Sequence, residues 1–264
     1  MRLFVPGPLQ AHTDLSLPPG PARHAQVRRV QPGDVLSLFD GSGQDWPATV
    51  LAVGRSTVDV RLGAPQPVSN ELPVAVHLAV GMPANERMDN LIEKATELGV
   101  ASLQPLLCER AVLRLEGERA QRKQAHWQAV AQAACEQSGR ARVPSIAPVL
   151  TLRVWLALQA AEADSADASV TRLVLSLRAD ASALAAISPT DPTSPINVTA
   201  DEATSPTVWL LSGPEGGLTA AEEDAARKVG FQPVSLGPRT LRADTAPLAA
   251  LSWFSLARNL PGSG

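Results

Sequence analysis

The chain has 264 residues, of which 45% are apolar, and its 23 basic and 26 acidic side chains give a net charge of −3. This composition is typical of a globular protein with a core, and the small net charge does not by itself indicate a nucleic-acid-binding protein. The apolar runs are too short to cross a bilayer and the N-terminus lacks the apolar region of a signal peptide, so we expect a cytoplasmic protein without a membrane partner.

The first 72 residues carry the pattern of a small β-domain. Residues 21–30 suit one or two helical turns, residues 33–43 form an apolar run that ends on a turn signal, and residues 48–63 hold two alternating runs separated by a glycine. Short strands between glycine and proline turns predict a small barrel. The turn-rich residues 63–73 mark a junction, so we expect the first domain to end there.

Beyond the junction, the pattern changes to strands that alternate with helices. Such alternation predicts an α/β fold with a mostly parallel sheet for the second domain, residues 73–264. Residues 187–206 are rich in Pro, Ser, Thr and Asp without periodicity, which predicts a flexible surface insertion. The expected strands lie at 74–81, 100–107, 171–178, 207–212 and 232–237, and the expected helices at 85–99, 118–139, 219–230 and 245–260.

Residues 210–225, LLSGPEGGLTAAEEDA, join an expected strand to an expected helix. Thr219, followed three residues later by Glu222, predicts a capping box at the start of that helix. Three glycines at such a turn indicate that backbone approaches a ligand. The loop lacks the lysine of a P-loop and the glycine spacing of a dinucleotide fold, and Glu215 would repel a phosphate, so we expect a cationic or neutral ligand.

A second loop, LGPRTLRADTA at 236–246, joins the next strand to the last helix. Its Leu241 offers an apolar wall, and Arg239 and Arg242 lie beside that wall in the sequence. Bare backbone and apolar walls suit a flat adenine ring, whereas the planar guanidinium groups suit an anionic partner. The two loops together therefore predict an adenine-containing ligand next to an anionic substrate.

The two loops resemble the C-terminal signature of the bacterial 16S ribosomal RNA uridine-N3 methyltransferases, the RsmE type of SPOUT methyltransferase. GPEGGLTAAE is followed by LGPRTLRADTA, as in that family, although Ala243-Asp244 stand where the family usually has Thr-Glu. Three further segments are similar to the family's motifs in the same order, namely HAQVRRVQPGDVLSLFDGSG at 24–43, ERMDNLIEKATELGVASLQPLLCER at 86–110 and ACEQSGRARVP at 134–144. The resemblance therefore spans nearly the whole chain.

The resemblance implies a PUA-like β-barrel, residues 1–72, that binds RNA ahead of a SPOUT α/β domain, residues 73–264. Within that second domain, residues 207–260 would form a C-terminal trefoil knot, a rare exception to the rule that chains do not thread their own loops. The implied cofactor is S-adenosylmethionine, and the implied substrate is N3 of a uridine in 16S ribosomal RNA of the assembled small subunit. A homodimer with its site near the subunit interface is implied as well.

The resemblance also implies roles for individual residues. Arg242 is the first choice, and Arg140 the second, for a positive group that stabilises the deprotonated uridine, while Glu136 or Glu215 would accept the proton or fix an arginine. The residues expected to contact RNA are Arg29, Arg140 and Arg239. The residues expected to contact the cofactor are Leu175, Leu211, Ser212, Gly213, Glu215, Gly217, Leu236, Gly237, Leu241 and Thr245.

Two other functions remain open on the sequence. One is a non-catalytic RNA-binding ribosome-assembly factor that keeps this fold, although intact glycine loops argue against it. The other is a SPOUT methyltransferase that acts on another RNA. Metal chemistry is not expected, because the two cysteines and four scattered histidines have no metal-ligand spacing.

Overall fold

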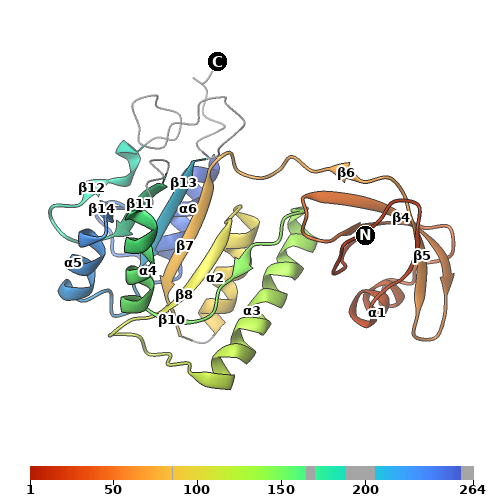
Figure 1. The fold of residues 1–264 in the computed structure, drawn as a ribbon, viewed down its shortest axis with the longest axis horizontal. Coiled ribbons are helices and arrows are strands. Elements are labelled where there is room, and N and C mark those ends of the chain that lie inside the picture. The colour runs from red at the N-terminus through yellow and green to blue at the C-terminus, as the bar shows by residue number, and fades with distance from the viewer. Residues whose placement is uncertain (85, 165–169, 188–205, 257–264) are drawn as a thin grey trace, which may run out of the picture. The chain divides into compact units, whose positions relative to one another are not determined.

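A computed structural model describes residues 1–84, 86–164, 170–187 and 206–256 (Figure 1). The described residues form two compact units. Unit 1 holds residues 1–71 together with 132–143, and unit 2 holds residues 72–131 together with the described residues from 144 onward.

Unit 1 is built on a sheet of six strands in the order β1-β3-β4-β5-β2, with β6 paired to β4. The pairings are antiparallel except that β1 runs parallel to β3. The helix and the three long strands expected from the sequence are confirmed, whereas β1, β2 and β6 are too short to leave a periodic signal. The bounds are β1 Arg2–Phe4, β2 Asp14–Ser16, α1 Pro19–Val27, β3 Val35–Phe39, β4 Gln44–Val53, β5 Val58–Leu62 and β6 Gln66–Pro67.

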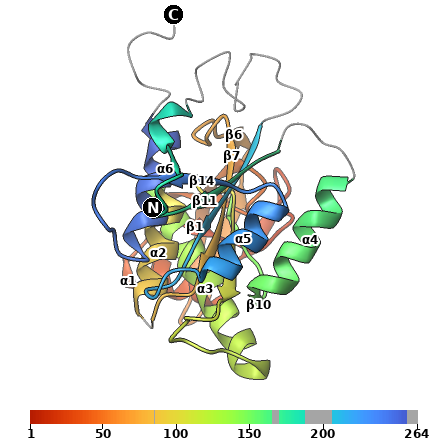
Figure 2. The same ribbon diagram turned by 90° about the vertical axis from the view of Figure 1, so that its left-hand side faces the viewer.

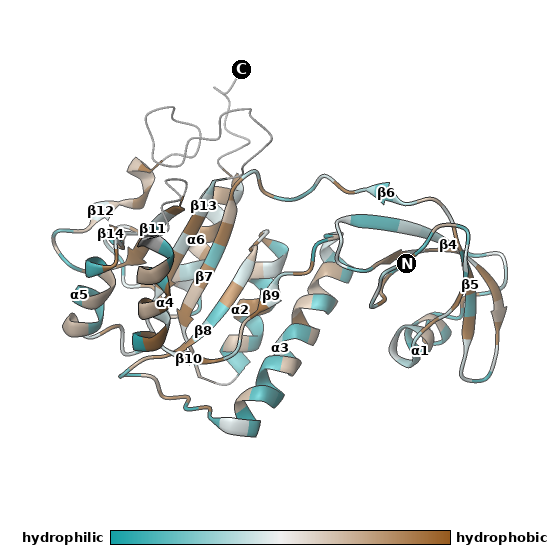
Figure 3. Cartoon of the chain, viewed as in Figure 1, coloured by the Kyte–Doolittle hydropathy of each residue, from teal (hydrophilic) through white to brown (hydrophobic). Residues whose placement is uncertain are grey.

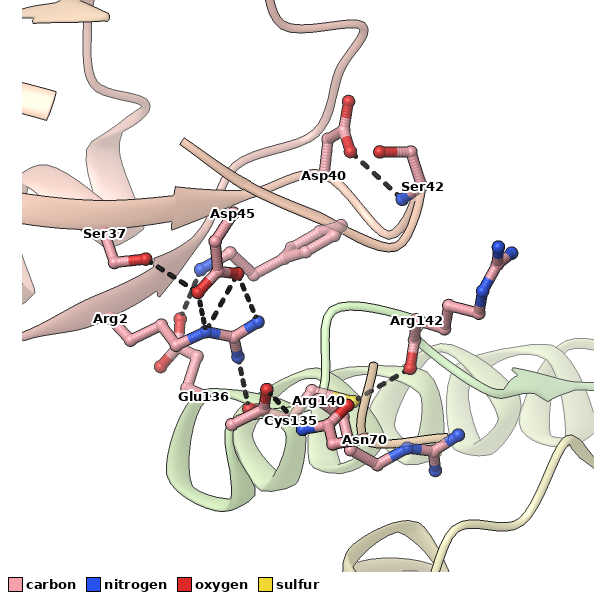
Figure 4. A network of polar contacts seen from close by, with 12 residues as sticks. Arg2, Ser37, Asp40, Ser42, Asp45, Asn70, Cys135, Glu136, Arg140 and Arg142 are labelled. Carbon is pink, nitrogen blue, oxygen red and sulfur yellow. Dashed lines mark hydrogen bonds and ion pairs between the residues drawn. The ribbon is translucent and has the colours of Figure 1, made fainter. Parts of the chain in front are cut away.

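Residues 132–143 pack within unit 1, although the sequence pattern assigned them to the second domain. Figure 4 shows how the Arg2 guanidinium joins this segment to the sheet, since it donates to the Asp45 carboxylate at 2.7 Å and to the Cys135 carbonyl at 2.6 Å. The Arg2 guanidinium also lies 3.8 Å from the centre of the Phe39 ring. Helical periodicity does not reveal which partner a helix packs on, and the division at residue 72 stays a prediction.

Unit 2 is an α/β unit whose sheet has the order β10-β8-β7-β13-β11-β14-β12, with β9 paired to β8. Every pairing in this sheet is parallel, which confirms the expected α/β class. The strands are β7 Ala75–Gly81, β8 Ser102–Leu107, β9 Ser145–Ile146, β10 Leu150–Thr151, β11 Val170–Leu175, β12 Ser182–Ala183, β13 Thr207–Ser212 and β14 Gln232–Ser235. The helices are α2 Glu86–Glu97, α3 Gly117–Ser138, α4 Leu152–Asp164, η1 Leu184–Ala186, α5 Ala220–Lys228 and α6 Thr245–Leu256, and the part of α3 from residue 132 onward belongs to unit 1.

Helices cover both faces of the parallel sheet, so its strands are apolar along their length. In Figure 2, α2 and α6 lie on one side of the sheet and α4 and α5 on the other, and Figure 3 shows the central strands largely in the brown of hydrophobic residues. On the α4 side, Trp155 packs edge-on against Trp209 with ring centres 5.4 Å apart, and Phe231 lies beside Trp155. Packing on both faces fixes the strand ends, which carry the site described below.

The α2 helix confirms the expected spacing of apolar residues. Its side chains at Met88, Leu91, Ile92 and Ala95 are all buried. Gly99 follows with φ of +95°, a conformation that glycine adopts at the end of a helix without strain.

The expected capping box at the start of α5 is present. The Thr219 hydroxyl accepts from the Glu222 N–H at 3.2 Å, and the Glu222 carboxylate accepts from the Thr219 N–H at 2.9 Å. We expect Thr219→Ala to lower the free energy of unfolding by about 1 kcal/mol, because a helix-end N–H group loses its acceptor. Urea denaturation checks this, with Thr219→Ser as the control that keeps the hydroxyl. Equal stability of the two variants would contradict a contribution from this bond.

None of the described helices is long and apolar enough to span a bilayer. The expected flexible insertion at 187–206 lies outside the described residues except at its two ends.

Candidate active site

The carboxyl ends of three neighbouring strands form the site. In the sheet of unit 2, β11 lies between β13 and β14, so the loops that follow these three strands meet at one edge. Parallel α/β sheets bind ligands in this position, outside the carboxyl ends of the strands. The loops beginning at Ser176, Gly213 and Leu236 enclose a cavity of about 740 Å³, a volume within the range of small-molecule sites.

Glycine backbone and apolar side chains make up much of the cavity wall. Gly217 and Gly237 have positive φ angles of 68° and 104°. A Cβ added at either position would have no heavy atom within 4 Å, so both glycines face open space. The apolar wall consists of Leu175, Leu177, Leu218, Val234, Leu236 and Leu241.

The glycine loop is held in place from both sides. The Gly217 N–H donates to the Pro214 carbonyl at 2.8 Å and closes a tight turn. The Glu215 carboxylate accepts from the Ala84 N–H at 2.9 Å and from the Arg87 guanidinium at 3.3 Å. Glu215 therefore anchors the loop, and its carboxylate already accepts hydrogen bonds from Ala84 and Arg87.

Two guanidinium groups at the cavity are available to a partner. Arg239 and Arg242 line the cavity and are exposed, and neither side chain makes a hydrogen bond or ion pair within the part of the chain that the structure describes. The Arg242 carbonyl accepts from the N–H groups of Thr245 and Ala246, at 3.0 and 2.9 Å, which fixes its backbone to the first turn of α6. An anionic group at the cavity mouth would meet these two arginines.

The cavity includes most of the residues expected to contact a cofactor. Leu211 is an exception, because its side chain is fully buried in the core of unit 2. Thr245 is another, because it lines a neighbouring cavity of about 500 Å³ that shares Leu236, Gly237, Arg239 and Leu241 with the first. The expected contact residues in the lining are Leu175, Ser212, Gly213, Glu215, Gly217, Leu236, Gly237 and Leu241.

Arg140 and Glu136 are not in the cavity lining and are engaged within unit 1. The Arg140 side chain pairs with the Glu71 carboxylate at 2.6 Å, and Arg140 is only 4% exposed. One Glu136 carboxylate oxygen accepts from the Phe4 N–H at 2.8 Å. Figure 4 shows both side chains within the network of polar contacts that includes the end of α3. Their proposed catalytic roles stay predictions.

Arg140→Ala separates a structural role from a catalytic one. We expect the variant to lose roughly 3 kcal/mol of unfolding free energy, because the Glu71 carboxylate keeps its charge without its buried partner. Denaturant unfolding measures the loss, and replacing both residues by apolar ones, Arg140→Met with Glu71→Leu, should recover most of it. A variant of normal stability but no turnover would instead favour the catalytic role.

Arg29 is exposed in unit 1, two residues after the last residue of α1, with φ of +58°. Its side chain makes no hydrogen bond or ion pair to the residues that the structure describes, and its expected RNA contact stays a prediction.

Five charged or polar residues of the lining were not expected from the sequence: Arg87, Thr240, Ser176, Arg178 and Glu223. The last two lie on different elements, since Arg178 follows β11 and Glu223 is in the first turn of α5. Only the order of the strands in the sheet brings these elements together, so no local pattern could have indicated them.

Neither cysteine provides a nucleophile. Burial raises the pKa of the Cys108 thiol to about 12 and that of the Cys135 thiol to about 11, so both stay protonated at neutral pH. Among the described residues, no group of three or more His, Cys, Asp or Glu side chains could hold a metal ion.

Comparison with known proteins places this architecture in a family. The model of the RNA methyltransferase domain matches residues 70–255, and the model of the RNA methyltransferase PUA domain matches residues 22–63. The chain is 35% identical to the ribosomal RNA small subunit methyltransferase E of Synechocystis, over 86% of this chain and 67% of that protein. It is 30% identical to the Bacillus subtilis protein of the same name, over 89% of this chain and 86% of that one.

Two similar structures contain a bound cofactor. A methyltransferase of Legionella pneumophila in complex with S-adenosylmethionine matches with a TM-score of 0.82 and 31% identity, over 97% of each chain. The ribosomal RNA small subunit methyltransferase E of Neisseria gonorrhoeae bound to S-adenosylmethionine matches with a TM-score of 0.80 and 33% identity, over 95% of this chain and 94% of that one. The chain therefore belongs to the RNA methyltransferase family that includes the ribosomal RNA small subunit methyltransferases E.

Proposed function

We propose that this protein uses S-adenosylmethionine to methylate N3 of a uridine in 16S ribosomal RNA. The observation that carries the proposal is the cavity at the carboxyl ends of β11, β13 and β14. Glycine backbone and apolar walls lie there next to Arg239 and Arg242, whose side chains have no partner among the described residues. The relatives named above support the ribosomal RNA substrate and the cofactor.

The cavity residues fit S-adenosylmethionine. The open space at Gly217 and Gly237 leaves backbone accessible to the edge of an adenine, and leucines such as Leu175 and Leu241 can contact its faces. The cofactor supplies a methyl group activated by its sulfonium charge. The chain's own residues have to bind this molecule, orient it and keep its methyl group open to the RNA.

Arg242 stabilises the uridine as its N3 proton leaves. Loss of that proton places negative charge on the ring and its carbonyl oxygens, and a preorganised guanidinium lowers the energy of this anion. Arg242 has its backbone fixed by α6 and its side chain free of other partners among the described residues, as this role requires. Arg140 is the second choice for the same role, and Glu136 or Glu215 the choice for the proton acceptor.

N3 lies on the pairing edge of uracil, so the target base has to be unpaired or flipped out before it can react. Arg239 at the cavity mouth and Arg29 and Arg140 in unit 1 are the proposed RNA contacts. In this proposal, residues 1–72 form the RNA-binding PUA-like barrel, and the cytoplasmic small subunit is the substrate.

Two finer features of the fold belong to the proposal. One is a trefoil knot over residues 207–260, of which 257–260 lie outside the described residues, with crossing loops that grip the cofactor. The other is a SPOUT domain, residues 73–264, that pairs two chains into a homodimer. The interleaved strand order, with β11 between β13 and β14, is compatible with such a knot.

Two measurements test the function. Isothermal titration with S-adenosylmethionine should give heat that saturates at one cofactor per chain, and absence of heat at high cofactor concentration would favour a non-catalytic RNA-binding protein. Mass mapping of 16S ribosomal RNA should show a methylated uridine that disappears when this chain is deleted and returns when it is supplied. A methyl group lost instead from another RNA would reassign the substrate.

A further inference from the structure

Glu223 is a buried carboxylate in the cavity wall with no role in the function proposed so far. It is 9% exposed, lies in the first turn of α5 and lines the cavity. The Ser176 hydroxyl donates to its Oε1 at 2.6 Å, and the Arg178 guanidinium lies 4.0 Å from the same oxygen. The Ser176 hydroxyl in turn accepts from the Arg178 N–H at 3.1 Å, so the carboxylate is held in one orientation.

The second carboxylate oxygen of Glu223 is free to accept a hydrogen bond from a ligand. No hydrogen bond to Oε2 is made by the described residues, and this atom is not among the fully enclosed polar atoms that lack a partner. A carboxylate that is mostly withdrawn from water is stabilised when each oxygen has a donor. Because Glu223 lines the cavity, a ligand bound there can supply this donor; the other acidic residue of the lining, Glu215, already accepts from Ala84 and Arg87.

A neutral hydroxyl is sufficient as the donor. The Glu223 carboxylate already has a cation nearby, the Arg178 guanidinium, which also pairs with Asp180 at 3.3 Å and with Asp224 at 3.1 Å. Carboxylates bind ribose hydroxyls in this way in dinucleotide sites. Because S-adenosylmethionine carries a ribose diol, and given the function proposed above, we propose that Glu223, positioned by Ser176, binds a ribose hydroxyl of the cofactor.

Paired changes in ligand and protein test this contact. The ligands are S-adenosylhomocysteine and its 2′-deoxy and 3′-deoxy analogues, titrated into the full-length protein by calorimetry. Wild-type protein should bind one of the deoxy analogues about 10- to 100-fold more weakly than the parent, as expected for a hydrogen bond to a charged group. Glu223→Ala should bind the parent more weakly by a similar factor and should no longer distinguish it from that analogue.

Two further variants distinguish loss of the Glu223 contact from a general effect of changing a side chain in this region. Glu223→Gln keeps the size of the side chain and an acceptor for Ser176, but turns an amide donor toward the cavity, so it should also weaken binding. Asp224→Ala removes the adjacent carboxylate, which pairs with Arg178 at 3.1 Å and is not in the lining, and it should leave affinity within about twofold. Thermal unfolding verifies that each variant folds.

The outcomes are distinct. Unchanged affinity in both Glu223 variants overturns the proposal, as does an equal loss for the deoxy analogues in wild type and Glu223→Ala. A ligand without the amino-acid tail, 5′-methylthioadenosine, should lose affinity on Glu223→Ala, and an unchanged affinity would assign Glu223 to the tail instead of the ribose. If wild-type protein binds none of the adenosyl ligands, the proposed function fails, and not only this contact.

Discussion

We expect Gly217→Val to abolish measurable binding of S-adenosylmethionine, which corresponds to an affinity loss of about 100-fold or more. The space next to the Gly217 Cα is open and belongs to the cavity, so a branched side chain would occupy volume that the cofactor needs. Isothermal titration measures the loss, and thermal unfolding reports whether the variant remains folded.

The matched control is Gly230→Val. Gly230 also has a positive φ, +92°, and open space next to its Cα, but it ends α5 outside the cavity lining. Valine at either position has a similar backbone strain, of roughly 1–2 kcal/mol, so the two variants should be destabilised alike. Only Gly217→Val should lose the cofactor, and retained binding in that variant would mean that the cavity is not the cofactor site.

We expect Arg242→Ala to lower the methylation rate by about 100- to 1000-fold while cofactor affinity stays near normal. The expected size is that of removing one preorganised donor from a developing anion. Single-turnover assays on 16S ribosomal RNA give the rate, and titration gives the affinity. A loss in rate without a loss in affinity assigns the guanidinium to the uridine and not to the cofactor.

Two further variants serve as controls for the Arg242→Ala result. Arg153→Ala removes an exposed arginine of α4 that is not in the cavity lining, and it should leave the rate unchanged. Arg242→Lys keeps the charge but loses the planar fork, so it should restore only part of the rate. If Arg242→Ala methylates at the normal rate, Arg242 has no part in the reaction, and Arg140 becomes the first candidate.

Much of the fold could be predicted from periodicity and turn chemistry. The side chains of Met88, Leu91, Ile92 and Ala95 fall on one helical face, and that face is buried. At the start of α5, Thr219 and Glu222 predicted the capping box that the structure contains. Both signals are local, so a single sequence carries them in full.

Elements with weak local signals could not be predicted. The α4 helix, Leu152–Asp164, exposes Val154 and Leu158 as well as burying Trp155 and Leu156, so its apolar residues do not gather on one face. The strands β9, β10 and β12 have two residues each, which is too short for any alternation to be read.

In the candidate site, too, the features with a local sequence signal could be predicted and those that depend on packing could not. The glycine loop and the loop that carries Arg239 and Arg242 are each a single stretch of sequence, and both line the same cavity. Ser176 and Glu223 are 47 residues apart and meet only because the end of β11 lies next to the start of α5. The sequence likewise gave no sign that the Arg140 side chain pairs with Glu71, and the expected role of Arg140 in RNA contact or catalysis stays a prediction.

The packing of residues 132–143 into unit 1 has a consequence for how the protein is made. During synthesis, the sheet formed by the first 71 residues leaves the exit tunnel without the segment that bonds to Arg2, and its last component emerges only after about 60 further residues. A fragment that stops near residue 71 would lack this component permanently. The amino-terminal unit therefore matures late, because the nascent chain can complete it only after the whole of α3 and the residues up to 143 have been translated.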